Sequence, residues 1–135
     1  MKIKAIKQFE TASSKYSATE YYELINNYVE NSTTSGADKS EEKIGFTALN
    51  QRRIRRILKT YKVSPAMHDS INNIEVEQHW YIFTEAWCGD SAQISPVLSK
   101  IAEASGGKIQ LEFLFRDDNP TLIDEYLTNG GRSIP

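Results

Sequence analysis

One stretch, residues 80–91, constrains the fold of this 135-residue chain more than any other. It begins with an apolar run rich in aromatic and β-branched side chains, which is typical of a buried strand. A short turn containing Gly89 follows, and apolar residues then recur at helical spacing between Ile94 and Ile101. This second pattern predicts an amphipathic helix. Cys88 is therefore expected where a strand ends and a helix begins.

A cysteine at the start of a helix is a candidate nucleophile, because the free N–H groups and the dipole of that end favour a negative charge. We expect the Ser91 hydroxyl, one turn along, to donate a hydrogen bond to the thiolate. The carboxylate of Asp90 opposes ionisation. Trp87 is either a flat apolar contact surface or a packing residue. Glu85 and Asp90 are interpreted as solvated charges, since nothing else in the sequence supports acid–base hydrolysis.

Several residues after and around Cys88 resemble the thioredoxin superfamily. The triplet Trp87-Cys88-Gly89 is followed by Pro96, at the place where thioredoxins carry a proline inside the helix. The segment at residues 130–135, which ends in Ile134-Pro135, is similar to the approach of thioredoxins to their cis-proline. The likeness covers residues 77–135 and is strongest to a bacterial thioredoxin-like group with a Trp-Cys-Gly-Asp turn.

The resemblance implies an α/β fold built on a strand, helix and second strand, the last at residues 108–115. It divides the chain into an N-terminal helical extension at 1–76 and an incomplete thioredoxin-like core at 77–135. In the family a hairpin and a final helix follow the proline, so a chain truncated at Pro135 is expected. One edge of the strand at 78–85 would then be bare, which favours self-association.

Two departures from the family pattern bear on function. The usual second cysteine is Ser91, which gives a Cys-x-x-Ser motif, and the usual buried acid six residues before the first cysteine is Ile82. The resemblance therefore implies a monothiol thiol-disulfide oxidoreductase that forms mixed disulfides, with Cys88 and Ser91 as its catalytic residues. The expected substrate contacts are Trp87, Gly89, Asp90, Ile134 and Pro135.

Two alternatives stay open. The chain is a redox-inactive thioredoxin-fold interaction module, or Ser91 is an engineered replacement of a cysteine that traps partners. Protein disulfides or glutathione are the expected partners, and no cofactor is expected beyond a thiol such as glutathione as co-substrate. A single cysteine excludes an internal disulfide and fits a reducing, cytoplasmic compartment.

Composition argues against other function classes. A net charge of −2 gives no overall attraction to nucleic acid or to an anionic membrane, and no apolar run is long enough to span a bilayer. His68 and His79 lack a nearby cysteine or carboxylate cluster, so no metal site is expected. The basic face of the helix predicted at 47–61 is interpreted as a solvated surface rather than a phosphate-binding patch. That face comprises Arg52, Arg53, Arg55, Arg56, Lys59 and Lys62.

The other segments have weaker patterns. Residues 1–16 favour an arm or a short edge strand, and Ser17 opens a helix through a capping box with Glu20. The polar residues 31–40 predict a mobile loop. Ser64-Pro65 begins a short helix that ends near Ile74, and Asn119-Pro120 begins the last one, as cap and first helical residue. The expected inner face of that last helix comprises Leu122, Ile123, Tyr126 and Leu127.

Overall fold

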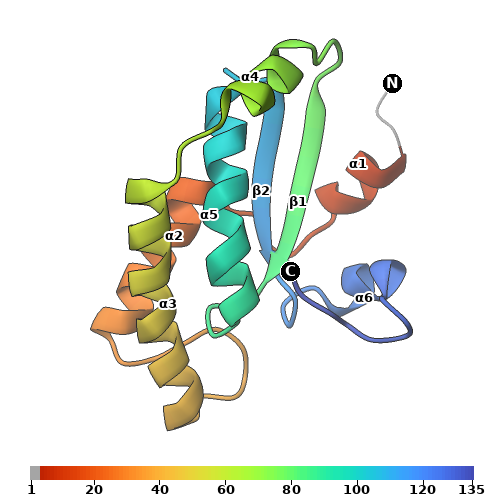
Figure 1. The fold of residues 1–135 in the computed structure, drawn as a ribbon. Coiled ribbons are helices and arrows are strands. Elements are labelled where there is room, and N and C mark those ends of the chain that lie inside the picture. Colours follow the sequence, from red (N-terminus) through yellow and green to blue (C-terminus); the bar gives the residue numbers. More distant parts are fainter. Residues whose placement is uncertain (1–3) are drawn as a thin grey trace.

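A two-stranded parallel sheet lies at the centre of the computed structural model, which describes residues 4–135 (Figure 1). Strand β1, Gln78–Thr84, pairs with β2, Ile109–Phe115, in a register that runs from Gln78 opposite Ile109 to Thr84 opposite Phe115. Helix α5, Gly89–Ala104, connects the two strands. The predicted α/β class and the order strand, helix, strand are confirmed.

Helix α5 begins and ends where the sequence predicts. Cys88 is its N-cap, and Pro96 lies inside it. Ser105 is the C-cap, and Gly106 follows with φ +62°, a left-handed conformation that glycine adopts without steric cost. The turn before the helix therefore places Cys88 at the carboxyl end of β1.

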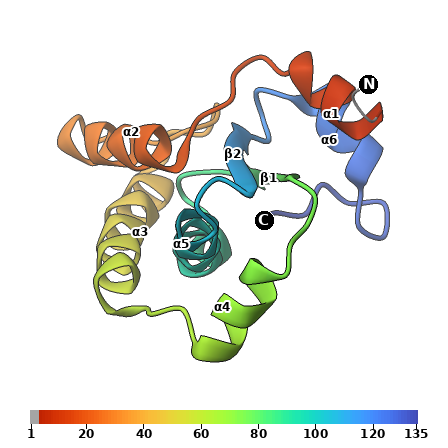
Figure 2. The same ribbon diagram turned by 90° about the horizontal axis from the view of Figure 1, so that it is seen from above.

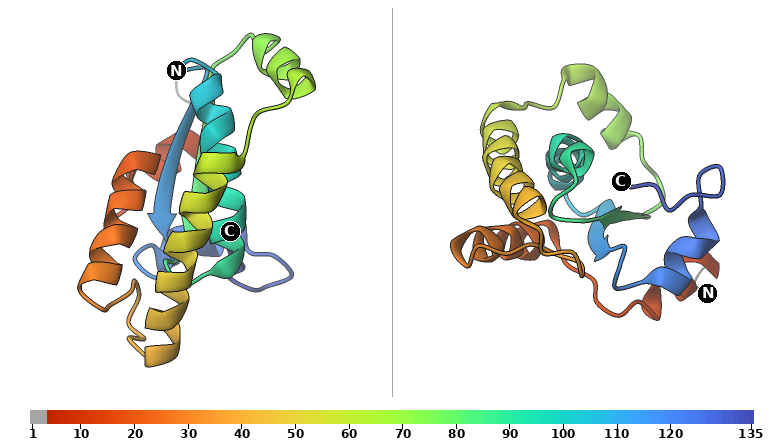
Figure 3. Two further views of the ribbon diagram at one scale, coloured as in Figure 1. Left: turned by 60° about the vertical axis from the view of Figure 1, so that its left-hand side comes forward. Right: turned by 90° about the horizontal axis from the view of Figure 1, so that it is seen from below.

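Helices α2, Ala18–Glu30, and α3, Glu41–Thr60, lie on the α5 side of the sheet (Figure 2). The capping box of Ser17 with Glu20 is present. Tyr21 stacks on Phe113 with ring centroids 4.4 Å apart, in a cluster that also includes side chains from α2, α3 and β1. Helices α2 and α3 thus share one core with the sheet, and Figure 3 shows how the ribbons of these helices lie beside β2 and α5. The division of the chain at residue 76 stays a prediction.

The opposite face of the sheet is covered by α1, Lys4–Glu10, and by α6, Pro120–Ile123, with the 3-10 turn Asp124–Tyr126 (Figure 2). The prediction of an arm or strand in the first 16 residues is wrong for residues 4–10, and residues 1–3 lie outside the described part. Phe9 anchors α1 on the sheet, because its side chain is buried and stacks on Tyr81 with ring centroids 4.0 Å apart.

Three local predictions need correction. Helix α3 begins six residues earlier than expected, because the Ser40 hydroxyl accepts a hydrogen bond from the Lys43 N–H. Leu127 is 42% exposed and does not belong to the predicted inner face, and Tyr126 is 40% exposed although its ring lies 5.5 Å from that of Phe9. Asn119 does not cap α6 with its side chain. Its amide instead donates to the Phe115 carbonyl and accepts from the backbone N–H of residue 13.

The loop at residues 31–40 is irregular, as expected, but it is anchored rather than free. Thr34 and Ser35 are buried, and the Thr34 hydroxyl lies 2.6 Å from the hydroxyl of Thr47 on α3. Helix α4, Pro65–Asn72, comes after α3 in the sequence, and Ser64 is its N-cap, as predicted.

The two edges of the sheet differ. The outer edge of β2 carries an antiparallel bridge between Tyr16 and Phe113, with hydrogen bonds of 2.9 and 2.7 Å. Within residues 4–135, β1 pairs with β2 and with no other strand. Its first residues, Gln78 and His79, are exposed.

Candidate active site

Cys88 forms the junction between β1 and α5. Its Sγ accepts a hydrogen bond from the backbone N–H of Ser91 at 3.4 Å, and its own N–H donates to the Glu85 carbonyl at 3.0 Å. The side chain is 9% exposed. A sulfur at an N-cap receives the N–H that a serine or aspartate oxygen receives in other helices, and a charged acceptor makes such a bond stronger.

The Ser91 side chain does not act as predicted. Its hydroxyl is buried, and no hydrogen-bond partner for it exists among the described residues. The predicted hydrogen bond from this hydroxyl to Cys88 is therefore wrong. The contact comes from the backbone of Ser91, because the N–H of the third helical residue points back to the N-cap.

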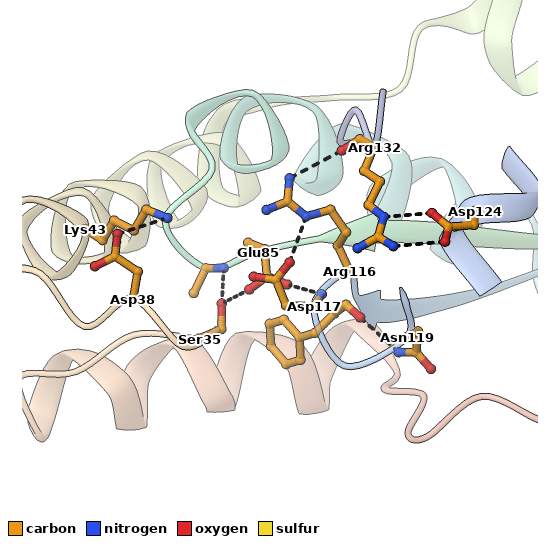
Figure 4. Close-up of polar contacts among 11 residues, drawn as sticks. Ser35, Asp38, Lys43, Glu85, Arg116, Asp117, Asn119, Asp124 and Arg132 are labelled. Carbon is orange, nitrogen blue, oxygen red and sulfur yellow. Dashed lines mark hydrogen bonds and ion pairs between the residues drawn. The ribbon is translucent and has the colours of Figure 1, made fainter. Parts of the chain in front are cut away.

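The C-terminal segment lies beside Cys88 in space, although Ile134 is 46 residues away from it in the sequence. The Sγ of Cys88 lies 3.9 Å from the Ile134 carbonyl oxygen, and the Ile134–Pro135 peptide bond is cis, as the resemblance implies. Arg132 holds this segment through two hydrogen bonds to the Asp124 carboxylate, at 2.7 and 2.9 Å (Figure 4). The same hydrogen bonds keep the pKa of Asp124 below its usual value.

A surface pocket of about 380 Å³ lies beside the turn. Four of the predicted site residues line it, namely Trp87, Cys88, Gly89 and Asp90. Ile134 and Pro135 do not line it, although the Ile134 carbonyl oxygen lies 3.9 Å from the sulfur. The rest of the lining comes from α3 and was not foreseen. It comprises Glu42, Lys43, Phe46 and Arg53.

Trp87 is half-buried and contacts cations. The Lys43 Nζ lies 4.0 Å from the centroid of its ring, and the Arg116 Cζ lies 5.3 Å from it. Both distances suit cation–π attraction. Lys43 also forms an ion pair of 3.5 Å with Asp38 (Figure 4). Trp87 is therefore both a wall of the pocket and a packing residue.

Glu85 is buried, which contradicts its interpretation as a solvated charge. Its carboxylate accepts a hydrogen bond from the Ser35 hydroxyl at 2.7 Å and another from the backbone N–H of Asp117 at 3.1 Å (Figure 4). Burial raises the pKa of Glu85, and these two hydrogen bonds oppose the rise. The sequence lacked any indication of this contact, since Ser35 is 50 residues away. Asp90 is exposed, as expected.

One residue of the basic face on α3 belongs to the site. Arg53 is half-buried, and its Nη1 donates to the Asn50 amide oxygen at 3.0 Å. A Cβ placed on Gly89 would lie 3.0 Å from the same Nη1, so the guanidinium lies directly against the first residue of α5. Arg52, Arg55 and Arg56 are exposed, which agrees with a solvated face for that part of the helix.

Metal ligands do not gather in the part of the chain that the structure describes, where no group of three or more His, Cys, Asp or Glu side chains is placed to hold an ion. His79 lies 3.2 Å from the Glu77 carboxylate.

None of the described helices has both the length and the apolar character that crossing a membrane requires.

Much of the sequence is similar to known thioredoxins. A family model described as thioredoxin matches residues 36–135, which include α3, the sheet and the Cys88 turn. A thioredoxin of Pyropia yezoensis is 43% identical over 53 residues, which are 39% of this chain and 47% of the relative. Thioredoxin 1 of a Nostoc species is 38% identical with the same coverage. The chain thus spans about half the length of the relatives it matches. No solved structure matches it.

Proposed function

The chain belongs to the thioredoxin family, and from this premise we propose that it is a thiol-disulfide oxidoreductase that acts through Cys88 alone. One observation carries the proposal. The only cysteine of the sequence is the N-cap of α5, it lines a surface pocket, and its Sγ lies 3.9 Å from the Ile134 carbonyl oxygen.

The proposed reaction is thiol–disulfide exchange. The Cys88 thiolate attacks one sulfur of a disulfide, so a bond forms between the two sulfurs and the original disulfide bond breaks. The other sulfur leaves as a thiolate and takes a proton from water. Cys88 is oxidised to a mixed disulfide, and the leaving sulfur is reduced. Since position 91 is serine, an external thiol such as glutathione attacks the mixed disulfide and regenerates Cys88.

The turn supplies positioning for this step. The Ser91 N–H donates to the sulfur, and Trp87, Gly89 and Asp90 line the pocket beside it. Ile134 and Pro135 are proposed to contact the substrate as well, because the Ile134 carbonyl oxygen lies 3.9 Å from the sulfur. We propose protein disulfides and glutathione as the partners, and a reducing, cytoplasmic compartment as the place of action.

The second candidate is an interaction module in which Cys88 has no redox role. The observation that favours it is the 9% exposure of this side chain. Within residues 4–135, β1 pairs with no strand other than β2, and strand-to-strand pairing is proposed as the route by which such a module would self-associate. Size-exclusion chromatography over a range of protein concentrations tests this route, and a monomer at every concentration speaks against it.

The decisive experiment is incubation with oxidised glutathione across a range of pH, followed by mass spectrometry of the intact protein. The proposed oxidoreductase gains one glutathionyl group, and the Cys88→Ser variant gains none. Added reduced glutathione removes the group from the wild-type protein. If no adduct forms even well above about pH 8.5, where an ordinary thiol is largely ionised, the interaction module replaces the proposal.

A further inference from the structure

The pocket beside Cys88 has one wall from α3, and this wall carries the Arg53 guanidinium against Gly89, the residue that follows Cys88. We propose that Arg53 selects disulfides that bear a carboxylate close to the disulfide bond. This inference rests on the proposed function, because it names the class of substrate that the same thiol attacks.

The placement of Arg53 is specific. Its Nη1 lies 3.0 Å from the position that a Cβ on Gly89 would take, and Gly89 directly follows Cys88. The Asn50 amide oxygen accepts from the same Nη1 at 3.0 Å, while the Asn50 amide nitrogen donates to the Ala86 carbonyl at 3.0 Å. Asn50 is buried, so this pair of bonds fixes the guanidinium relative to the turn. Arg53 and Cys88 line the same pocket, so a substituent next to a sulfur joined to Cys88 is expected within reach of the guanidinium.

The other charged side chains of the pocket either have a partner within the protein or are exposed to solvent. The Lys43 Nζ pairs with Asp38 and lies over the Trp87 ring. Glu42 and Asp90 are exposed, so water and salt screen their repulsion of an anion. Arg53 is half-buried and forms no ion pair within residues 4–135.

A carboxylate is the group that best satisfies such a guanidinium. Arginine presents several N–H donors in a planar fork that matches the two oxygens of a carboxylate, and one of its nitrogens is already bound to Asn50. Oxidised glutathione and a protein cysteine beside an aspartate share this chemistry. Phe46, 44% exposed, adds an apolar contact at the same pocket.

The test compares rate constants for mixed-disulfide formation, measured by mass spectrometry. The small probes are oxidised glutathione, which is anionic, and hydroxyethyl disulfide, which is neutral. Two peptide disulfides, with Asp or Asn beside the cysteine, distinguish a protein source of the carboxylate from the free tripeptide. The variants are Arg53→Gln and Arg53→Glu. Arg52→Gln is the matched control, since it removes the same charge from an exposed position of the same helix.

The measured quantity is the ratio of the anionic to the neutral rate constant. We expect Arg53→Gln to lower this ratio by about three- to tenfold, which lies between the effects of exposed and of fully buried charge pairs. Arg53→Glu lowers it further, and Arg52→Gln changes it less than about twofold because exposed charges are screened. An unchanged ratio in Arg53→Gln, including a parallel loss of both rates, overturns the inference while the proposed function stands. A wild-type protein that reacts with neither disulfide overturns both.

Discussion

The Ser35 hydroxyl donates a hydrogen bond of 2.7 Å to the buried carboxylate of Glu85, across 50 residues of sequence. The same hydroxyl accepts from the backbone N–H of Ala86 at 2.8 Å. A single serine of the loop before α3 thus contacts both the acid and the backbone of the turn that leads to Cys88. The second carboxylate oxygen accepts from the Asp117 N–H, so three chain segments meet at this side chain.

Removal of the Ser35 hydroxyl is expected to destabilise the fold. In Ser35→Ala, one oxygen of a buried carboxylate and the Ala86 N–H both lose their partner. A buried polar group without a partner costs about 1–3 kcal/mol in the free energy of unfolding. Urea denaturation measures this loss. Ser70→Ala is the control, because Ser70 is exposed on α4 and its change is expected within about 0.5 kcal/mol. Equal midpoints for the two variants would contradict the role given to Ser35.

Glu85 is expected to give stability an unusual dependence on pH. Burial raises its pKa in the folded state above the usual value of 4.5, so the folded protein holds this proton more tightly than the unfolded chain does. The contribution to stability is therefore full below pH 4.5 and is lost as the pH rises through the raised pKa. Glu20, Asp38 and Asp124 have lowered pKa values and act in the opposite direction.

The difference between wild type and Glu85→Gln isolates the effect of Glu85 from that of the other acids. Unfolding free energies at a series of pH values from about 4 upward should show the wild type losing stability relative to the variant as the pH rises. A difference that stays constant over this range, or that grows in favour of the wild type, would refute the assignment.

Patterns within short segments predicted the parts of the fold that local chemistry determines. Turn and cap preferences act over a few residues, and they account for three features of the fold. These are the start of α5 after Cys88, the glycine after its end, and the capping box at Ser17. The resemblance to the family added Ile134 and Pro135 as expected substrate contacts, which no local pattern contains, and the structure places the Ile134 carbonyl 3.9 Å from the Cys88 sulfur.

The remaining parts of the site depend on contacts between distant segments. Glu85 looked like a solvated charge because its partner Ser35 lies in a polar loop that carries no hydrophobic period. Arg53 looked like its exposed neighbours on α3, and only the packing of α3 against α5 distinguishes it. Residues 4–10 were expected as an arm or a short edge strand, because no local pattern shows that Phe9 stacks on Tyr81, 72 residues away in the sequence.

Phe9 is expected to hold α1 on the sheet. It is 5% exposed and also contacts the rings of Phe83 and Tyr126, with centroids 5.7 and 5.5 Å away. Truncation of a buried phenylalanine costs about 3–5 kcal/mol, so Phe9→Ala should lower the free energy of unfolding by that amount. Phe46→Ala is the matched control, since Phe46 is 44% exposed. Thermal or urea unfolding checks the pair, and equal stabilities would show that α1 contributes little.

Replacement of Ser91 by cysteine should convert the single-thiol site into a dithiol site. Residues three apart on a helix have Cβ atoms about 5–6 Å apart, and a disulfide needs about 3.5–4.5 Å, so a small shift of the first turn of α5 suffices. The buried Ser91 hydroxyl has no partner among the described residues, so the change sacrifices no hydrogen bond. Ser91→Cys should form an internal disulfide with Cys88 and release bound glutathione without an added thiol. Ser95→Cys is the control, because position 95 lies seven residues after Cys88, which corresponds to a rise of about 10 Å along the helix. Mass spectrometry follows both variants. An adduct on Ser91→Cys that lasts as long as that on Ser95→Cys would show that position 91 cannot reach the reacting sulfur.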